Sequence, residues 1–135
     1  MLLGARMLDQ VGNVNQFKVV DSIEFTQGDT ATVYIQLVDL TKDKAVEGFV
    51  PSGRRYVPAA GATLSIKLDN IDDALALTRT ATLPFTGDSS IWSFSVLATD
   101  KIQGTCALSL TLNESGIITR GRIEAVVLIH SQGAL

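Results

Sequence analysis

Side chains that could do chemistry are scarce in this chain of 135 residues. It contains one histidine, His130, and one cysteine, Cys106. A zinc site built from four cysteines, or from two cysteines and two histidines, is therefore excluded, as are an intrachain disulfide and a Cys-x-x-Cys redox pair. No nucleophile or carboxylate stands beside His130 in a recognised catalytic arrangement. We expect His130 to lie on the surface, Cys106 to be a small core residue, and the protein not to be an enzyme.

Two short motifs contain groups that bind ions in other proteins. Residues 69–73, Asp-Asn-Ile-Asp-Asp, offer oxygen ligands to Ca2+ but lack the spacing and the terminal glutamate of a calcium loop. Gly28 and Asp29 are not part of a Gly-x-x-x-x-Gly-Lys pattern, which a phosphate-binding loop requires. Both motifs are typical of turns. We therefore expect neither a metal nor a cofactor.

The charge pattern favours contacts with proteins over contacts with nucleic acids or membranes. The net charge is -3 at pH 7, the wrong sign for a nucleic-acid binder. Arg54, Arg55 and Tyr56 form a small basic-aromatic group, and Arg120 and Arg122 form another, but two isolated groups do not make a nucleic-acid groove. Arginine and tyrosine are instead favoured at protein interfaces.

The sequence contains no recognisable membrane-spanning helix and no recognisable secretory signal. The longest aliphatic run, residues 125–129, is far shorter than the roughly 20 residues that span a bilayer as a helix. The first nine residues have their positive charge after the apolar residues, which is the wrong order for a secretory signal. We expect no membrane partner and no export.

Alternation of apolar and polar residues predicts β-strands along most of the chain. Val, Ile and Thr together number 35, and β-branched side chains favour strands. Five segments alternate cleanly with one apolar face each: 32–37, 63–68, 91–97, 105–113 and 122–130. Three segments are weaker strand candidates: 17–25, which Asp21 and Ser22 interrupt, 54–57, and 77–85. A helical turn is expected at 98–103, and a less favoured one at 71–77.

Seven or eight short strands separated by turns predict an all-β fold, a two-sheet antiparallel immunoglobulin-like β-sandwich. Residues 17–135 are expected to form this single domain. Residues 1–16 lack the alternation, so we expect an N-terminal arm whose apolar side chains dock on its own domain or on a neighbour. Residues 39–61 are expected to be an extended hairpin or a partner-facing loop. The residues expected to contact a partner are Leu2, Leu3, Met7, Leu8, Phe49, Arg54, Arg55 and Tyr56.

The order of motifs along residues 17–130 adds a family resemblance. Residues 23–30, Ile-Glu-Phe-Thr-Gln-Gly-Asp-Thr, place a Gly-Asp-Thr turn before the strand at 33–37, and a strand at 62–68 follows a connecting loop. Residues 97–105 and 113–116 then flank the next strand. This arrangement resembles the small β-sandwich domains of bacteriophage tail and baseplate proteins, such as the N-terminal domain of siphophage upper baseplate proteins. The long 39–61 insertion departs from that pattern.

The resemblance implies a structural subunit of a tail, baseplate, neck or capsid-decoration assembly. Our leading hypothesis is therefore a non-enzymatic virion protein, assembled in the host cytoplasm, that contacts other virion proteins and copies of itself as a homo-oligomer. The alternative is a carbohydrate- or surface-binding module in which Trp92 or Tyr56 stacks on a sugar. Because Trp92 alternates with Phe94 and Val96, we expect it in the core.

Overall fold

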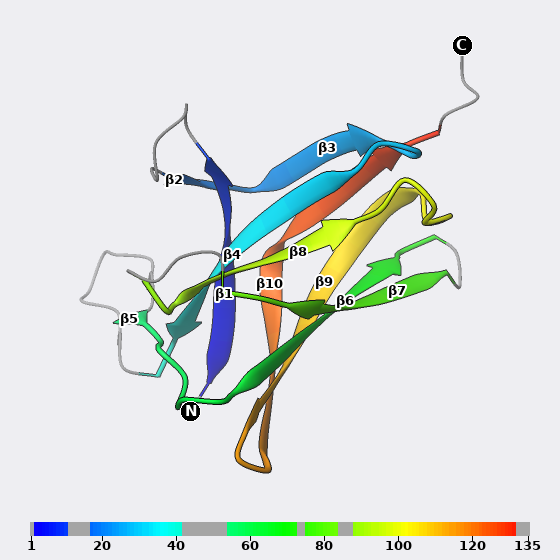
Figure 1. The fold of residues 1–135 in the computed structure, drawn as a ribbon. Coiled ribbons are helices and arrows are strands. Elements are labelled where there is room, and N and C mark those ends of the chain that lie inside the picture. The colour runs from blue at the N-terminus through cyan, green and yellow to red at the C-terminus, as the bar shows by residue number, and fades with distance from the viewer. Residues whose placement is uncertain (1, 11–16, 42–53, 73–74, 84–87, 132–135) are drawn as a thin grey trace.

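The structure is a computed structural model that describes residues 2–10, 17–41, 54–72, 75–83 and 88–131 (Figure 1). The described residues form β-strands and no helix. The strands are β1 (Leu3–Gln10), β2 (Phe17–Val20), β3 (Ser22–Thr26), β4 (Ala31–Asp39), β5 (Arg54–Arg55), β6 (Thr63–Asn70), β7 (Ala76–Ala81), β8 (Ile91–Val96), β9 (Gly104–Glu114) and β10 (Ile117–His130). The all-β prediction is confirmed, and each of the five cleanly alternating segments lies in a strand except for Leu97, which follows the end of β8.

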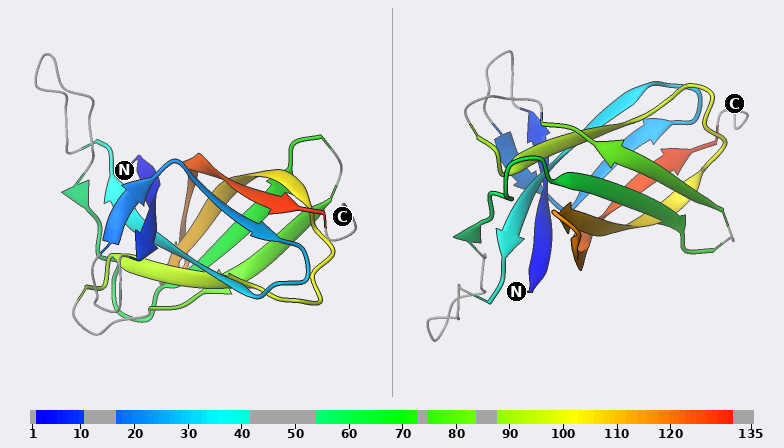
Figure 2. Two further views of the ribbon diagram at one scale, coloured as in Figure 1. Left: turned by 90° about the horizontal axis from the view of Figure 1, so that it is seen from above. Right: turned by 60° about the horizontal axis from the view of Figure 1, so that its bottom comes forward.

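All the strands belong to one mixed sheet rather than to two antiparallel sheets. The main path runs β5-β4-β1-β10-β9-β6-β7, while β2 pairs with β1, β3 with β10, and β8 with β4. Two pairings are parallel, β1 with β10 and β3 with β10. A bridge between Thr82 and Ser93 joins the end of β7 to β8. The sheet therefore curls until its two ends meet, as Figure 2 shows from two sides.

Residues 3–10 form a central strand and not the expected arm. β1 lies between β4, to which it is antiparallel, and β10, to which its first residues are parallel. Leu3 and Met7 are buried in the core, and Leu8 is buried on the opposite face of the strand. A strand covered on both faces does not show a simple alternation of apolar and polar residues. This double coverage explains why the pattern was mistaken for an arm; residues 11–16 lie outside the described residues.

The core lies inside the curled sheet and is built from alternate residues of its strands. The predicted inward faces are confirmed, including that of Trp92, Phe94 and Val96. Cys106 is also fully buried in this cluster, as expected. Burial of each large aliphatic or aromatic side chain stabilises the fold by about 1.5–3 kcal/mol. Packing among the side chains on the inner face of the sheet therefore holds it in its curled form.

An irregularity in β10 lets two different strands share its edge. The pairing of β10 with β9 shifts register between Ile123 and Val126. Before the shift β10 pairs with β1, and after it β10 pairs with β3. The N–H of Val126 donates to the carbonyl of Asp21, 3.1 Å away, where the chain passes from β2 to β3. The break expected at Asp21 and Ser22 is thus the point where the chain leaves β1 for β10.

Neither of the two predicted helical turns is present among the described residues, so both predictions are wrong. At 98–103 the chain makes a turn in which the N–H of Asp100 donates to the carbonyl of Leu97, and the Asp100 carboxylate accepts the N–H of Leu97 at 2.7 Å. This reciprocal pair closes the turn without a helix. At 71–77, the N–H of Asp72 donates to the Asn70 side chain, and β7 begins at Ala76. In both places a short acidic or amide side chain binds the local backbone, which favours a turn.

Candidate functional site

The predicted contact residues of the N-terminal segment separate into exposed and buried ones. Leu2 is 57% exposed, whereas Leu3, Met7 and Leu8 are buried. A buried core side chain cannot reach a partner, so the expectation for these three residues is corrected. Phe49 lies outside the described residues, and the structure describes only the backbone of Arg54, which pairs with β4.

Arg55 is held by a side-chain network at the edge of the sheet. Its Nη1 lies 3.1 Å from Oδ2 of Asp88, whose other oxygen accepts the backbone N–H of Ser90 at 3.0 Å. Burial raises the pKa of Asp88, but the two Ser90 hydrogen bonds and the Arg55 charge outweigh it and lower the pKa below its usual value. The Ser90 hydroxyl in turn accepts a hydrogen bond from Gln36. Arg55 thus fixes the start of β8 to β5.

Tyr56 is joined to the turn between β9 and β10. Its hydroxyl donates to the carboxylate of Glu114 at 2.8 Å, and the N–H of Ala59 donates to the same carboxylate at 3.0 Å. Burial, the hydrogen bond to Glu114 and the Glu114 and Asp39 charges raise the pKa of Tyr56 to about 12. The ring packs partly against the core. Tyr56 therefore has a structural role in holding residues 56–59 against β9.

Exposed apolar residues lie on the segments that meet at this end of the molecule, with Ile117 and Ile118 on opposite faces of β10. We name the hairpin-end surface after the β9–β10 turn and define it by Leu2, Val57, Ile117 and Ile118, which are 57%, 58%, 70% and 51% exposed. Glu114 binds the segment that contains Val57 and pairs with Ile117 across the turn. The residue after Leu2 pairs with β10. Figure 1 shows the N-terminus and the β9–β10 turn at the same end of the molecule.

The same hairpin has an edge without a second strand partner among the described residues. Residues 117–120 pair with β9 on one side, while the pairing of β10 with β1 begins at Gly121. The turn itself is tight, because Ser115 and Gly116 both have positive φ, 52° and 90°. Two such residues form the connection preferred by β-hairpins. The backbone of residues 117–120 can therefore pair with an added strand.

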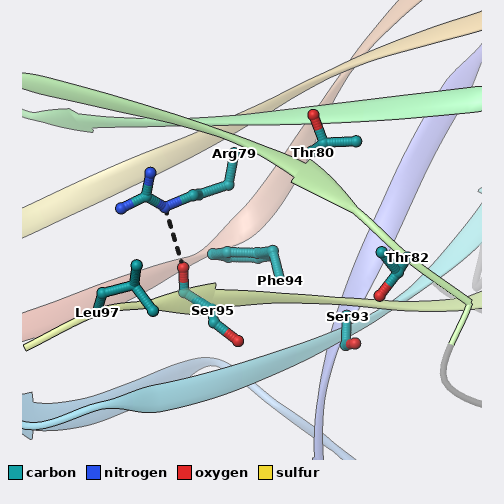
Figure 3. Close-up of a pocket in the computed structure, with 7 residues that line it drawn as sticks. All are labelled: Arg79, Thr80, Thr82, Ser93, Phe94, Ser95 and Leu97. Carbon is teal, nitrogen blue, oxygen red and sulfur yellow. Dashed lines mark hydrogen bonds between the residues drawn. The ribbon is translucent and has the colours of Figure 1, made fainter.

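A second candidate site is a hollow of about 250 Å³ between β7 and β8. Beyond the Thr82–Ser93 bridge the two strands diverge, and the hollow lies in the gap (Figure 3). It is lined by Arg79, Thr80, Thr82, Ser93, Phe94, Ser95 and Leu97. Nε of Arg79 donates to the carbonyl of Ser95 at 3.2 Å, and its guanidinium forms an ion pair with Asp100. Arg79 thus occupies the gap and links β7 to the chain after β8.

Replacement of Asp100 by Asn is expected to destabilise the protein by about 1.5–3 kcal/mol, the usual contribution of a hydrogen bond to a charged group. Burial raises the pKa of Asp100, but the hydrogen bonds from Arg79 and Leu97 and the Arg79 charge outweigh it and lower the pKa below 3.8. A lowered pKa contributes stability above pH 3.8 that is lost as the pH falls through the folded-state value.

Urea unfolding at pH 7 and at pH 3 measures this contribution. The difference in free energy of unfolding between the original protein and Asp100→Asn should be largest near neutral pH and shrink toward pH 3. Asp29→Asn, which changes an exposed carboxyl group, is the control and should have little effect at either pH. A difference that grows as the pH falls would contradict this assignment.

The remaining polar motifs do not meet in a common site. His130 is exposed and lies 3.3 Å from Glu24 on the neighbouring strand. In the turn after β6, the Asn70 side chain binds the carbonyl of Gln103. Burial, followed by the charge of Asp69, raises the pKa of the Cys106 thiol. Among the described residues, no three His, Cys, Asp or Glu side chains are close enough together to hold a metal.

Sequence reasoning missed the residues that the structure brings to the surface at these sites. Ile117 and Ile118 follow a Gly in a turn, and two adjacent apolar residues on one strand point to opposite faces, which was the available signal. The ion pair of Arg79 with Asp100 had no local signal. No helix in the described part of the chain is long and apolar enough to cross a membrane.

No match was found among protein-family models, curated proteins or solved structures. Among the described residues, the geometry offers an exposed apolar surface at a hairpin end, an unpaired strand edge beside it, and a small hollow that Arg79 already occupies. The first two are adjacent and form the candidate contact site.

Proposed function

We propose that the protein is a non-enzymatic structural subunit of a bacteriophage virion, in a tail, baseplate, neck or capsid-decoration assembly. It acts through protein–protein contacts with copies of itself and with other virion proteins. The motif order of residues 17–130 and the all-β fold support this function. In this proposal the curled sheet takes the place of the immunoglobulin-like sandwich that the resemblance implies.

The observation that carries the proposal is the hairpin-end surface. Complete burial of an isoleucine side chain stabilises a complex by about 1.5–3 kcal/mol, so Ile117 on one face of β10 and Ile118 on the other are each suited to anchor a contact. The neighbouring edge of residues 117–120 adds main-chain hydrogen bonds when a strand pairs with it. A symmetric ring repeats one such contact in every copy, so a modest surface is sufficient for assembly.

The alternative of a sugar-binding module is not favoured. Trp92 is only 5% exposed, and its ring is part of the core. The hydroxyl of Tyr56 is bound to Glu114, and its ring is partly buried. Neither aromatic side chain has the free face that stacking on a sugar requires.

Simultaneous replacement of Ile117 and Ile118 by Thr is expected to abolish self-association while leaving the fold intact. Thr keeps the β-branched shape that suits a strand but removes much of the apolar surface. Light scattering over a range of concentrations should give a mass above the 14.4 kDa of one chain for the original protein and close to that value for the variant. The free energy of unfolding should change by about 0.5 kcal/mol or less.

The matched control is Ile71→Thr, which changes an isoleucine that is 62% exposed in the turn after β6. This control should associate like the original protein. A monomeric original protein at every concentration would contradict self-association, and equal loss in the control would contradict the assignment to the hairpin end. Incorporation of tagged protein into purified particles tests the virion part of the proposal separately.

A further inference from the structure

Two straight rows of hydrogen-bonding side chains cross the outer face of β10, β9, β6 and β7. Residues in each row are direct partners across the ladders, so their positions follow from the strand register. The first row is Arg120, Thr111, Ser65 and Thr80, and the second is Arg122, Ser109, Lys67 and Thr78. We name these eight residues the donor face. Every member has an N–H or O–H group that can donate a hydrogen bond.

The donor face has a positive charge on a protein that is negative overall. It carries Arg120, Arg122 and Lys67, whereas the whole chain has a net charge of -3. Both arginines are exposed, and neither forms an ion pair with a side chain that the structure describes. Lys67 lies 3.5 Å from Asp69, at the margin of the face. The two arginines are therefore available to an external anion.

The spacing of the two arginines matches the spacing of alternate residues in an extended peptide. Arg120 and Arg122 are two residues apart on one strand, so their Cα atoms lie roughly 6.6–6.8 Å apart on the same face. Carboxylates at alternate positions of an extended peptide have this same spacing. A guanidinium group binds a carboxylate with two parallel hydrogen bonds, which a hydroxyl-rich neighbourhood can supplement.

The chemistry of the donor face also separates an acidic protein from other anions. None of its eight residues is aromatic, so it lacks the stacking platforms that bind single-stranded nucleic acid. The unpaired edge of residues 117–120 includes the backbone of Arg120 and offers main-chain pairing, which only a polypeptide can use.

From these observations we infer that the donor face binds an extended, acidic segment of a partner protein. The segment lies over the outer face of β10, with carboxylates at alternate positions on Arg120 and Arg122, and the part of it beyond Arg120 continues along the unpaired edge of residues 117–120. This inference goes beyond the proposed virion function, because it names the chemistry of a partner whether or not that partner is a virion protein. It also uses charged side chains that the hairpin-end surface does not include.

Fluorescence anisotropy with a labelled peptide tests the inference. The probe is a peptide of about ten residues in which Glu alternates with Thr, and the comparison peptide has Gln in place of each Glu. At low ionic strength the original protein should bind the acidic peptide at least about tenfold more tightly than the Gln peptide, and added salt should weaken the binding. The combined variant Arg120→Gln and Arg122→Gln should lose about tenfold in affinity for the acidic peptide.

The matched control is Lys18→Gln with Lys101→Gln, which removes two exposed positive charges elsewhere. It should bind within about twofold of the original protein, and thermal unfolding should show that both variants are folded. Equal loss of affinity in both variants would overturn the inference, because binding would then follow net charge alone. Binding of single-stranded DNA or a sulfated oligosaccharide as tight as that of the acidic peptide would also overturn it. If the replacement of Ile117 and Ile118 by Thr had no effect on self-association, the expected binding of the acidic peptide would be unchanged.

Discussion

A chain that lacks residues 1–10 is expected to lose its cooperative unfolding transition. The deletion removes β1, the strand that joins β4 to β10, and it takes Leu3 and Met7 out of the core. Loss of those two buried side chains alone costs about 3–6 kcal/mol at 1.5–3 kcal/mol each. A typical domain is stable by only about 5–15 kcal/mol in total. The exposed edges of β4 and β10 add to the loss.

Urea unfolding followed by tryptophan fluorescence measures the effect, because Trp92 is buried in the core. The control is Leu2→Ala, which alters an exposed residue of the same segment and should leave the transition unchanged. A peripheral arm would give a different result, since its removal would preserve the midpoint and the steepness of unfolding. Such an outcome would contradict the central position of β1.

Gly121→Ala is the single substitution that we expect to destabilise the sheet most, by about 3 kcal/mol. Gly121 is the partner of Leu3 at the start of the parallel pairing of β1 with β10. A Cβ at this position would clash with the carbonyl oxygen of Leu3 and would lie 3.1 Å from Cδ1 of Leu110. Because the carbonyl oxygen of Leu3 is a backbone atom, β1 and β10 must move apart to make room for the Cβ. The φ angle is not the cause, because Gly121 does not have a positive value.

Gly4→Ala is the comparison for this prediction. A Cβ at Gly4 would lie 3.0 Å from Cδ1 of Leu40, the end of a flexible side chain that can adjust. We therefore expect Gly4→Ala to cost about 1 kcal/mol or less. The midpoints of urea unfolding at a constant denaturant slope give both values. Equal losses for the two variants would show that close approach of the backbone at Gly121 does not limit the packing.

Sequence patterns were sufficient for the faces of the strands but not for their neighbours. In β4, β6, β8 and β9 the alternation identified which side chains are buried, because one face of each strand lies on the core and the other does not. The same alternation contains no information on which strand pairs with which. The parallel pairings of β10 with β1 and β3 were therefore missed, and one curled sheet was mistaken for two.

The candidate site was predictable only in part, for a related physical reason. Tyr56 and Arg55 were identified as contact residues, but their partners Glu114 and Asp88 are distant in sequence, so their structural role could not be read locally. Ile117 lies at the start of β10, outside the regularly alternating segment 122–130, so the pattern did not single it out. Residues whose role depends on long-range pairing were thus the ones that the sequence did not reveal.

The position of β1 also has a consequence for the time at which the protein can fold. β1 is the first strand of the described chain and β10 the last, and they are direct neighbours in the sheet. During synthesis at about 5–20 residues per second, β1 therefore waits several seconds for its partner to leave the ribosome. In that interval the apolar residues of β1 and its edge that pairs with β10 remain uncovered. We conclude that the sheet is completed only after β10 has left the ribosome, with a slow step set by the meeting of β1 and β10.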